Sequence, residues 1–599
     1  MFSPIAPQAQ RPPRVRLLLN TALAFLLSVL LAGWLLFLTY PPMGWYQDHP
    51  FPADLPWLAE ALISNIQFHV KDGPLQFLLS SRADSYRTLL APLYRYELIQ
   101  GVSWRLFTLL AAALAAVLIA RRYASRHYEL VNDLRHIRGR QHLTGKIANS
   151  SFRQHMRKDI KRTGKGLCIA PKAILSADVE SKHMLLIGAS GAGKTQIMRF
   201  WVDQLLVQNT RMILHDPKGD MTAFLPTERF ILLAPHDKRS WAWDIAKDCV
   251  GLAAARELAA RLIPQAKDPL WTNGAREILT GLLRWLQTKH ETVWSWTELR
   301  DIAFNNPPEL KTMVLEVYPE GANFIEVDPE TGTPNKTSYS FLVTLWSYVG
   351  SIISPLALAW EKTPDEKRVS LTQWIATEET ERPVIILQKS AEFDVLSKAW
   401  IGAAVQLLAN FAASPALEDS RERKVWLLLD EFAQMGKLSG FQQFLEVGRS
   451  RGIRTVLGLQ DLEQLAHLYG REALKTWLNT IETKIVCRMN AGPSSSFISK
   501  DLIGQREVAW EEVSTSVTHN DWFSDQREKK NTSRHIRSAT IPVLMPDYFE
   551  RDLGPMEVQG EPRIRALVLG RGDVYQFDWP LTLWRQQRPG AIPAPWLTE

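Results

Sequence analysis

Apolar residues along the chain occur in two patterns, as short unbroken runs and as longer stretches with three- and four-residue spacing. The short runs are rich in Val, Ile and Leu and lie within 184–187, 212–214, 229–235, 382–388, 425–432, 452–460 and 483–489. Unbroken apolar runs of this length predict strands that are buried on both faces, as in a parallel sheet. Helix-like stretches at 196–206 and 392–413 follow two of them, so we expect crossover helices between parallel strands.

The pattern becomes helical between residues 251 and 376. The stretches AARELAARLI, GAREILTGLLRWLQ and SFLVTLWSYVGSII place apolar residues three and four positions apart, as on one face of a helix. We therefore expect an all-α domain at 251–376, inserted between two parts of one sheet domain, 173–250 and 377–599. Near the end of the chain, IRALVLGRGDVYQFDW predicts a β-hairpin that turns at 570–573.

Two further apolar stretches are long enough to cross a membrane. Residues 17–40 carry no charge, and residues 102–120 carry one, Arg105; each suits a transmembrane helix through about 30 Å of hydrocarbon. A cleaved signal peptide is the alternative for the first stretch, but its apolar core is usually shorter. Arginines at 11, 14 and 16 precede the first stretch and arginines at 121, 122 and 126 follow the second. This bias places both ends of the chain, including an arm at 1–16, in the cytoplasm and the loop 41–101 outside.

Composition and charge indicate a folded protein with a basic segment next to the membrane. Of the 599 residues, 46% are hydrophobic and 22% are charged, and the formal net charge is +7; these values are typical of globular chains. The three cysteines, Cys168, Cys249 and Cys487, lack metal-ligand spacing. Residues 121–172 are strongly basic, and we assign them to a cytoplasmic stem that faces either anionic lipid or nucleic acid.

The clearest chemical motif is a glycine-rich loop between the first predicted strand and a helix. Its residues fit G-x-x-x-x-G-K-[ST]: Gly188, Ala189, Ser190, Gly191, Ala192, Gly193, Lys194 and Thr195. Backbone N–H groups of such a loop surround phosphate oxygens, the lysine reaches the β and γ phosphates, and the hydroxyl binds Mg²⁺. A chance match in a glycine-rich loop is the alternative, and the strand in front argues against it. The motif thus predicts a site for a nucleoside triphosphate.

Polar residues at the ends of two other predicted strands complete this site. Asp430 and Glu431 follow the run VWLLL, and we expect Asp430 to hold Mg²⁺ and Glu431 to activate water as a general base. Gln460 ends the run GIRTVLGLQ, at a position suited to sensing the γ-phosphate or orienting water. Acidic pairs and single glutamines at strand ends also occur without function, so the phosphate loop carries most of the prediction.

A basic cluster, VGRSRGIR, supplies Arg449, Arg451 and Arg454. In a ring of identical subunits, an arginine here is able to reach the nucleotide of a neighbour as a trans-acting finger. The alternative is a solvated basic face.

Taken in order, five motifs resemble the type IV coupling proteins of bacterial conjugation, in particular their TraD-type members. The motifs are the phosphate loop, DPKGD at 216–220, PLWTNGAREIL at 269–279, LLLDEFAQMGK at 427–437 and GRSRGIRTVLGLQDLEQL at 448–465. The two predicted membrane spans match this family as well. The resemblance implies an α/β fold, a RecA-like P-loop NTPase core related to FtsK and HerA, with an inserted all-α domain and two transmembrane helices.

The resemblance also implies a function. Such proteins form a hexameric ATPase at the bacterial inner membrane, recruit DNA bound to a relaxase and deliver it to a type IV secretion channel. By motif position, ATP and Mg²⁺ are held by Lys194, Thr195 and Asp430, the base is Glu431, and the sensor is Gln460. The arginine finger falls on Arg449, with Arg451 as its rival. DNA, single- or double-stranded, is then bound through its phosphates and largely independently of sequence.

We expect this chain to differ from the family in one feature, and the sequence leaves one segment and two alternative functions undecided. The sequence ends at APWLTE without the extended acidic tail of longer TraD proteins, so we expect no relaxosome contact through such a tail. The polar, basic segment 520–537 predicts a loop that either contacts DNA or a neighbour, or is merely solvated. Two other functions remain: a chromosomal DNA translocase of the FtsK type, and a nucleotide-gated docking receptor for secreted proteins without motor activity.

Overall fold

The computed structural model describes residues 25–30, 107, 110–118, 134–518 and 529–598 and divides the chain into two compact units. The first unit comprises residues 1–138 and 507–541, and the second comprises residues 139–506 and 542–599. The predicted N-terminal arm and extracytoplasmic loop, and most of the two predicted membrane spans, lie outside the described residues. The described parts of the spans, 25–30 and 110–118, are helical.

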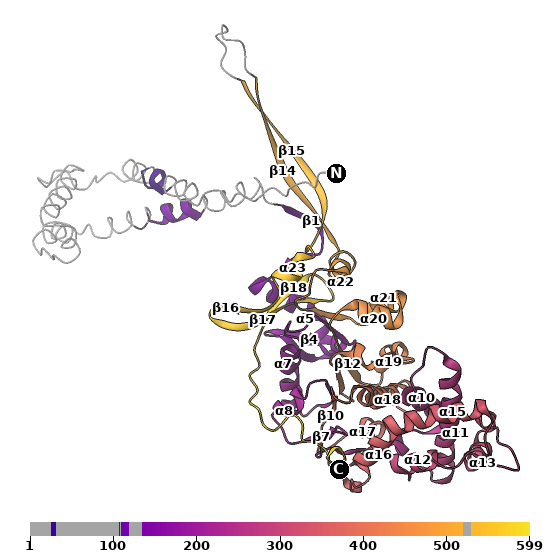
Figure 1. The fold of residues 1–599 in the computed structure, drawn as a ribbon. Coiled ribbons are helices and arrows are strands. Elements are labelled where there is room, and N and C mark those ends of the chain that lie inside the picture. The colour runs from indigo at the N-terminus through magenta and orange to yellow at the C-terminus, as the bar shows by residue number, and fades with distance from the viewer. Residues whose placement is uncertain (1–24, 31–106, 108–109, 119–133, 519–528, 599) are drawn as a thin grey trace, which may run out of the picture. The chain divides into compact units, whose positions relative to one another are not determined.

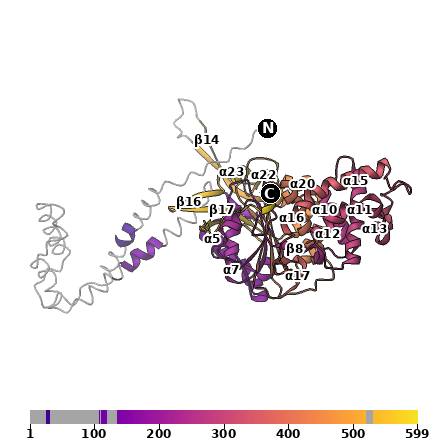
Figure 2. The same ribbon diagram turned by 60° about the horizontal axis from the view of Figure 1, so that its bottom comes forward.

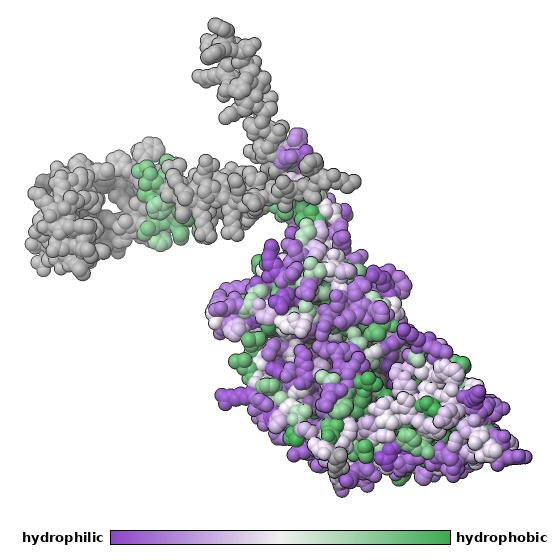
Figure 3. Space-filling view, in the orientation of Figure 1, coloured by the Kyte–Doolittle hydropathy of each residue, from purple (hydrophilic) through white to green (hydrophobic). Residues whose placement is uncertain are grey.

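The described parts of the predicted spans expose large apolar side chains, and they stand out as hydrophobic in Figure 3. Phe25, Leu27, Leu110 and Leu114 are 45%, 57%, 66% and 63% exposed, respectively. Two other helical stretches, Lys336–Trp360 and Asp394–Ala413, are also long and apolar enough to cross a membrane. In these two, 44% and 78% of the most apolar window is buried inside the molecule, as expected of helices that contribute to a core.

The first unit contains a three-stranded sheet in the order β1, β14, β15 (Figure 1). These strands are β1 (Arg135–Gly139), β14 (Gln505–Thr518) and β15 (Lys529–Pro542). Ion pairs within the unit join Arg138 to Glu507 at 2.6 Å and Arg537 to Glu512 at 2.5 Å. Residues 529–537 are therefore strand, and the prediction of a loop across 520–537 is wrong for this part. The sequence does not predict this strand, because its charged residues do not alternate regularly with apolar residues.

Within the described residues, the main sheet of the second unit has eleven strands. The order across the sheet is β2 (His142–Leu143), β18 (Val574–Pro580), β17 (Glu561–Leu569), β13 (Thr483–Val486), β5 (Met184–Ile187), β12 (Ile453–Leu459), β11 (Val425–Leu429), β6 (Arg211–Asp216), β10 (Val384–Gln388) and β7 (Phe230–Leu233), and β16 (Gly554–Val558) pairs with β17. The seven strands from β13 to β7 are parallel. β17 and β18 form the predicted antiparallel hairpin that turns at 570–573.

The register aligns the carboxyl ends of the parallel strands. Ile187 lies opposite Leu459, Leu457 opposite Leu429, and Leu429 in turn opposite His215. Gln388 lies opposite Asp216 on the next pair. Residues that directly follow these strands therefore meet at one edge of the sheet, where ligands bind in open α/β folds.

Both faces of the sheet are covered, because its central strands contribute alternate side chains to two separate cores. Met184 and Leu186 face one core, and Leu185 and Ile187 face the other. The first core is covered by α5 (Gly145–Thr163) and α7 (Lys194–Val207), and the second by α18 (Asp394–Ala413) and α19 (Phe441–Gly448) together with the helical region. Figure 2 shows the helical region on one side of the sheet and α5 and α7 on the other.

Part of the predicted basic stem belongs to the first core. α5 and β3 (Lys165–Ala170) contribute buried side chains to it, as does β4 (Ala173–Ser176), which follows the predicted stem. Phe152 of α5 is buried and makes edge-to-face contacts with Tyr575 and Phe577 of β18, with ring centroids 5.2 and 5.7 Å apart. The assignment of 121–172 to a stem therefore needs correction from Gly145 onward. The basic residues of α5 lie on the exposed face of an amphipathic helix. They dominate the composition of this segment, so composition alone does not reveal the apolar face.

The helical region between residues 251 and 376 holds a series of helices, several of which begin with a side-chain cap. They are α10 (Gly251–Leu262), α11 (Pro269–Lys289), α12 (Trp296–Ala303), α13 (Pro307–Val317), α14 (Pro319–Ala322), α15 (Lys336–Tyr348), a π-helical turn at Val349–Ile353, α16 (Ser354–Trp360) and α17 (Leu371–Ala376). Asp268, Ser295 and Asn335 accept hydrogen bonds from backbone N–H groups at the starts of α11, α12 and α15, and such caps typically stabilise a helix by about 1 kcal/mol.

The helical region is tied to the sheet layer at its entry and exit. β8 (Ala242–Trp243), which precedes the region, and β9 (Arg368–Val369), which lies near its end, pair in parallel. The buried carboxylate of Asp248 accepts hydrogen bonds from Trp243 Nε1 at 2.7 Å, Ser370 Oγ at 2.5 Å and Thr372 Oγ1 at 2.6 Å. Burial raises the pKa of Asp248, although these hydrogen bonds oppose the change. One carboxylate thus joins both ends of the helical region.

Residues 581–598, named here the C-terminal strap, run from the end of β18 towards the end of β7 (Figure 1). Trp584 Nε1 donates to Asp203 Oδ1 on α7 at 2.7 Å, and Gly590 O accepts from Gln388 Nε2 at 2.8 Å. Trp596 Nε1 donates to Pro235 O at 2.7 Å. The strap therefore fastens α7 to the carboxyl ends of β10 and β7.

Candidate functional site

The glycine-rich loop lies between β5 and α7, as the motif predicts. Gly193 has a φ of +94°, a left-handed conformation that is strained for residues with a side chain. A Cβ there would also come within 2.6 Å of Ile564. A Cβ on Gly188 would meet the Cβ of Cys487 at 2.7 Å. Glycine is therefore required at Gly193 by backbone conformation and close packing, and at Gly188 by close packing.

Lys194, the first residue of α7, folds back over the loop. Its ammonium Nζ donates to the carbonyl oxygens of Gly188 at 2.7 Å and Ala189 at 3.1 Å. Burial lowers the pKa of Lys194, while the nearby carboxylate of Asp430 acts to raise it. A buried ammonium whose hydrogen bonds within the described residues go to loop carbonyls suits a phosphate oxygen as an additional partner.

Thr195 and Asp430 bring two oxygen groups together next to the loop. Thr195 Oγ1 donates to Asp430 Oδ2 at 3.4 Å, a long hydrogen bond across 235 residues of sequence. Burial raises the pKa of Asp430, and Lys194 acts to lower it. Hydroxyl and carboxylate oxygens are ligands that Mg²⁺ prefers. Among the described residues no group of three or more His, Cys, Asp or Glu side chains is placed to hold a metal ion, so a cation here would also need phosphate or water ligands.

Glu431 follows Asp430 in a left-handed conformation, with a φ of +52°. Its Oε1 accepts a hydrogen bond from Gln460 Nε2 at 3.0 Å, and its Oε2 accepts one from Gln434 Nε2. The non-glycine residue is strained by this backbone conformation, a feature that recurs at functional sites. The structure thus places Glu431 in direct contact with Gln460 and with Gln434.

His215 supports the turn that carries the two acids. It lies on β6, is 3% exposed, and its Nδ1 donates to Asp430 O at 2.5 Å. Burial lowers the pKa of His215 to about 4, so the imidazole is neutral at physiological pH. The next residue, Asp216, accepts hydrogen bonds from Thr222 N at 2.7 Å and Thr222 Oγ1 at 2.9 Å, and burial raises its pKa.

Arg449 and Arg451 lie elsewhere, near the amino end of β12. Gln460 directly follows the carboxyl end of this seven-residue strand, so roughly 20 Å of strand separates the arginines from the phosphate loop. Arg449 Nη2 contacts Asp178 Oδ1 at 2.6 Å and its side chain is 48% exposed. Arg451 contacts Asp419 at 3.3 Å and is 17% exposed. Arg449 is thus the more accessible of the two candidates for a trans-acting finger.

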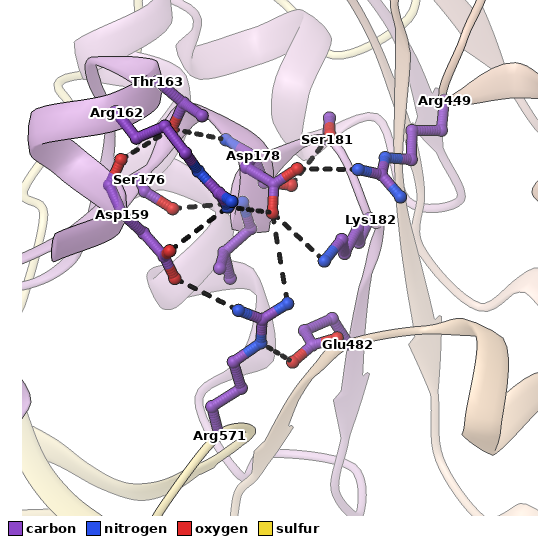
Figure 4. Close-up of polar contacts among 11 residues, drawn as sticks. Asp159, Arg162, Thr163, Ser176, Asp178, Ser181, Lys182, Arg449, Glu482 and Arg571 are labelled. Atoms are coloured by element: carbon purple, nitrogen blue, oxygen red, sulfur yellow. Dashed lines mark hydrogen bonds and ion pairs between the residues drawn. The ribbon is translucent and has the colours of Figure 1, made fainter. Parts of the chain in front are cut away.

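Asp178 is shared among several cations (Figure 4). Besides Arg449, its carboxylate contacts Lys182 at 3.1 Å and Arg162 and Arg571 at 4.0 Å each. Burial acts to raise the pKa of Asp178, but Lys182, Arg449 and Arg571 outweigh it, and the net pKa is lowered. The carboxylate therefore stays ionised at neutral pH.

A groove of about 1290 Å³ opens beside Arg449. Its lining is more basic than acidic, with Arg162, Lys165, Arg421, Lys424, Arg449 and Arg454 against Asp178, Asp419 and Glu446. Such a surface favours an anionic partner.

The fold and the loop define the class of this protein as a P-loop NTPase with a RecA-like core. Residues 168–550 match the family model described as the type IV secretion-system coupling protein DNA-binding domain. The chain belongs to this family, the type IV secretion-system coupling proteins. The predicted fold class is thereby confirmed.

Known relatives are similar at low identity. Coupling protein TraD of Escherichia coli (strain K12) is 23% identical over 432 residues, which cover 66% of this chain and 57% of that relative. The conjugative coupling protein TrwBdeltaN70, in its unbound monoclinic form, has a TM-score of 0.58 at 19% identity, covering 76% of this chain and 96% of that one. TrwB in complex with ADP and Mg²⁺ has a TM-score of 0.56 at 18% identity, covering 77% and 98%. The likeness to these solved structures shows the fold.

Proposed function

We propose that this coupling protein is a membrane-anchored hexameric ATPase that links relaxase-bound DNA to a type IV secretion channel and drives DNA translocation. The observation that carries this proposal is the convergence at one sheet edge of the phosphate loop, the Thr195–Asp430 pair and the Glu431–Gln460 pair. The family to which the chain belongs supports the link to DNA and secretion. The complex of the similar protein TrwB with ADP and Mg²⁺ supports the choice of nucleotide and cation.

In the proposed site, bound ATP supplies the phosphoanhydride bond whose hydrolysis releases the energy. The loop from Gly188 to Thr195 binds the phosphates, with Lys194 on the β and γ groups and with Thr195 and Asp430 holding Mg²⁺. Glu431 takes a proton from the attacking water, and Gln460 orients that water or senses the γ-phosphate. The charge of Lys194 offsets charge that develops on the phosphates during cleavage.

The proposed ring places Arg449 against the nucleotide of the neighbouring subunit. Arg449 lies at the end of β12 away from its own phosphate loop, and its side chain is half exposed. Both facts favour a role in trans, and the basic groove beside it favours an anionic target. Arg451, engaged with Asp419 and mostly buried, is the less favoured finger.

We propose that the chain is anchored in the inner membrane with both termini in the cytoplasm. The exposed apolar helices at 25–30 and 110–118 and the flanking arginines support this topology. DNA, single- or double-stranded, is bound through phosphate contacts, and relaxosome proteins and channel subunits are the protein partners. The net charge of +7 favours a polyanionic substrate.

The assignment of roles is tested by ATP binding and hydrolysis in the full-length chain, reconstituted in nanodiscs, with three variants. Lys194→Ala should weaken ATP binding, whereas Glu431→Gln should bind ATP normally and hydrolyse it at least about 100-fold more slowly. Glu463→Gln, which alters a partly exposed acid on α20 (Leu462–Tyr469), serves as the matched control. Normal turnover in Glu431→Gln would overturn the role of Glu431 as base.

A further inference from the structure

Both oxygens of the Glu431 carboxylate are occupied by side-chain amides. Gln460 donates to Oε1, and Gln434 donates to Oε2. Gln434 lies in a short 3₁₀ turn, Phe432–Met435, in which its backbone N–H donates to Glu431 O at 2.9 Å. The three-residue spacing of this turn brings the Gln434 side chain back over Glu431. An ionised carboxylate has two lone pairs on each oxygen, so each oxygen of Glu431 keeps one, but the two amides together fix the orientation of the carboxylate.

Lys389 determines which way the Gln434 amide faces. Lys389 follows β10, and its Nζ contacts Gln434 Oε1 at 2.7 Å. An ammonium group only donates hydrogen bonds, so the amide oxygen must face Lys389 and the NH₂ group is left to face Glu431. The Lys389 side chain is 14% exposed, which limits the alternative positions open to its charge.

Asp394 holds Lys389 in place and connects it to a helix. Asp394, the first residue of α18, contacts Lys389 Nζ at 2.8 Å. The hydrogen bond from Lys389 lowers the pKa of Asp394. α18 packs against α10 of the helical region, and Phe393 beside it contacts Trp596 of the C-terminal strap, with ring centroids 5.5 Å apart. Asp394, Lys389, Gln434 and Glu431 thus form a continuous polar chain from the start of α18 to the proposed base.

We propose that Gln434 is a positioning residue that restrains Glu431, and that Lys389, held by Asp394, keeps the Gln434 amide in the restraining orientation. Because Glu431 is the base only in the proposed function, this role depends on that function. Movement of α18 displaces Asp394 and Lys389, the amide loses its fixed orientation, and Glu431 is released to accept a proton from water. The helical region, which packs on α18, is thereby coupled to hydrolysis.

The test measures kcat and KM for ATP in the full-length chain in nanodiscs without DNA. Gln434→Leu removes the restraint, and Lys389→Met lets the amide turn its oxygen towards Glu431. Each should raise kcat about fivefold with KM unchanged, as expected for the loss of one charge-assisted hydrogen bond. Lys389→Arg keeps a donor-only cation and should restore the wild-type rate. An unchanged or lower kcat in Gln434→Leu would overturn the proposal.

Lys398 provides a matched control, because it contacts the same Asp394 carboxylate at 2.6 Å but has no contact with Gln434 among the described residues. Lys398→Met should leave kcat unchanged. A rise in kcat equal to that of Lys389→Met would contradict a specific role for Lys389 in the polar chain.

Wild-type protein that hydrolyses no ATP would refute the proposed function instead. The polar chain would still be tested then by thermal unfolding of Lys389→Met, Gln434→Leu and the double variant. Coupled effects on Tm support the chain, and additive effects overturn it.

Discussion

At the residue scale, the site shows how one turn gives different environments to two adjacent acids. Asp430 is buried beside Lys194 and Thr195, whereas Glu431 faces two amides. The motif in the sequence indicates which acids matter, because an apolar strand that ends in Asp-Glu after a phosphate loop is a specific pattern. It gives no sign of His215, Gln434 or Lys389. Their contacts join segments up to 215 residues apart, and single polar residues after strands are too common to select from sequence.

The buried histidine His215 makes the stability of the sheet domain sensitive to mild acid. Burial lowers its folded pKa to about 4 from the ordinary 6.5, so only the unfolded chain takes up a proton between these values. Stability should therefore be full above pH 6.5 and fall as pH drops towards 4, by up to about 3 kcal/mol for this residue. We expect His215→Asn, which retains an N–H donor, to flatten this part of the pH dependence.

The measurement is the midpoint of urea unfolding, followed by tryptophan fluorescence of the full-length chain in detergent at pH 7.5 and pH 5.0. His467→Asn, which alters an exposed histidine on α20 (Leu462–Tyr469), is the control. An equal loss of stability on acidification in wild type and His215→Asn would contradict the role assigned to His215. His183, also buried with a pKa of about 4, accounts for acid sensitivity that remains in the variant.

At the element scale, the apolar runs predict the parallel strands well because these strands are buried on both faces and need no alternation. The hairpin at 570–573 follows from its turn residues in the same way. The sequence does not predict elements whose packing partners lie far away along the chain. α5 is polar on one face and packs on a strand more than 400 residues later, and β15 is a charged strand whose pairing partners are not visible in its own pattern. Long-range packing, which local patterns do not encode, decides these elements.

The C-terminal strap is an element whose contribution to stability is directly testable. Arg588 donates to the carbonyl oxygens of Thr222 at 3.1 Å, Leu225 at 3.0 Å and Thr227 at 3.0 Å, at the end of α8 (Asp220–Phe224). Arg588→Ala leaves these carbonyls without their charged donor and should reduce the free energy of unfolding by about 2 kcal/mol. Arg585→Ala, on an exposed side chain of the same strap, should have little effect. Equal values of Tm for the two variants would show that Arg588 does not fasten the strap.

At the scale of the whole molecule, the central question is whether one active site draws residues from two subunits. Lys194 lies near the carboxyl ends of the parallel strands, and Arg449 lies near the amino end of β12. A single chain therefore does not bring them together. In a ring, Arg449→Ala and Lys194→Ala should each be inactive alone. A one-to-one mixture should regain about a quarter of the wild-type ATPase rate, because that share of interfaces pairs an intact lysine with an intact arginine. Arg423→Ala is the control partner, since the guanidinium of Arg423 donates to the backbone carbonyl oxygens of Glu418 and Arg451.

A mixture of Arg449→Ala and Lys194→Ala that stays as inactive as its parts would argue against a shared site. Repeating the mixture with Arg451→Ala in place of Arg449→Ala separates the two candidate arginines. Arg451, held by Asp419 and mostly buried, is expected to give an active variant on its own. An inactive Arg451→Ala that is complemented by Lys194→Ala would transfer the finger role to that residue.

The central claim, that ATP hydrolysis at this sheet edge drives movement of DNA, is tested most directly by the ATPase rate of the full-length chain in nanodiscs. The rate is measured with no DNA, with single-stranded DNA and with double-stranded DNA, each at two salt concentrations, with Lys194→Ala as the control. We predict stimulation by DNA that weakens as salt increases, because phosphate contacts dominate binding, and no activity in Lys194→Ala. A wild-type rate that DNA leaves unchanged at both salt concentrations would contradict a DNA motor and favour a nucleotide-gated receptor.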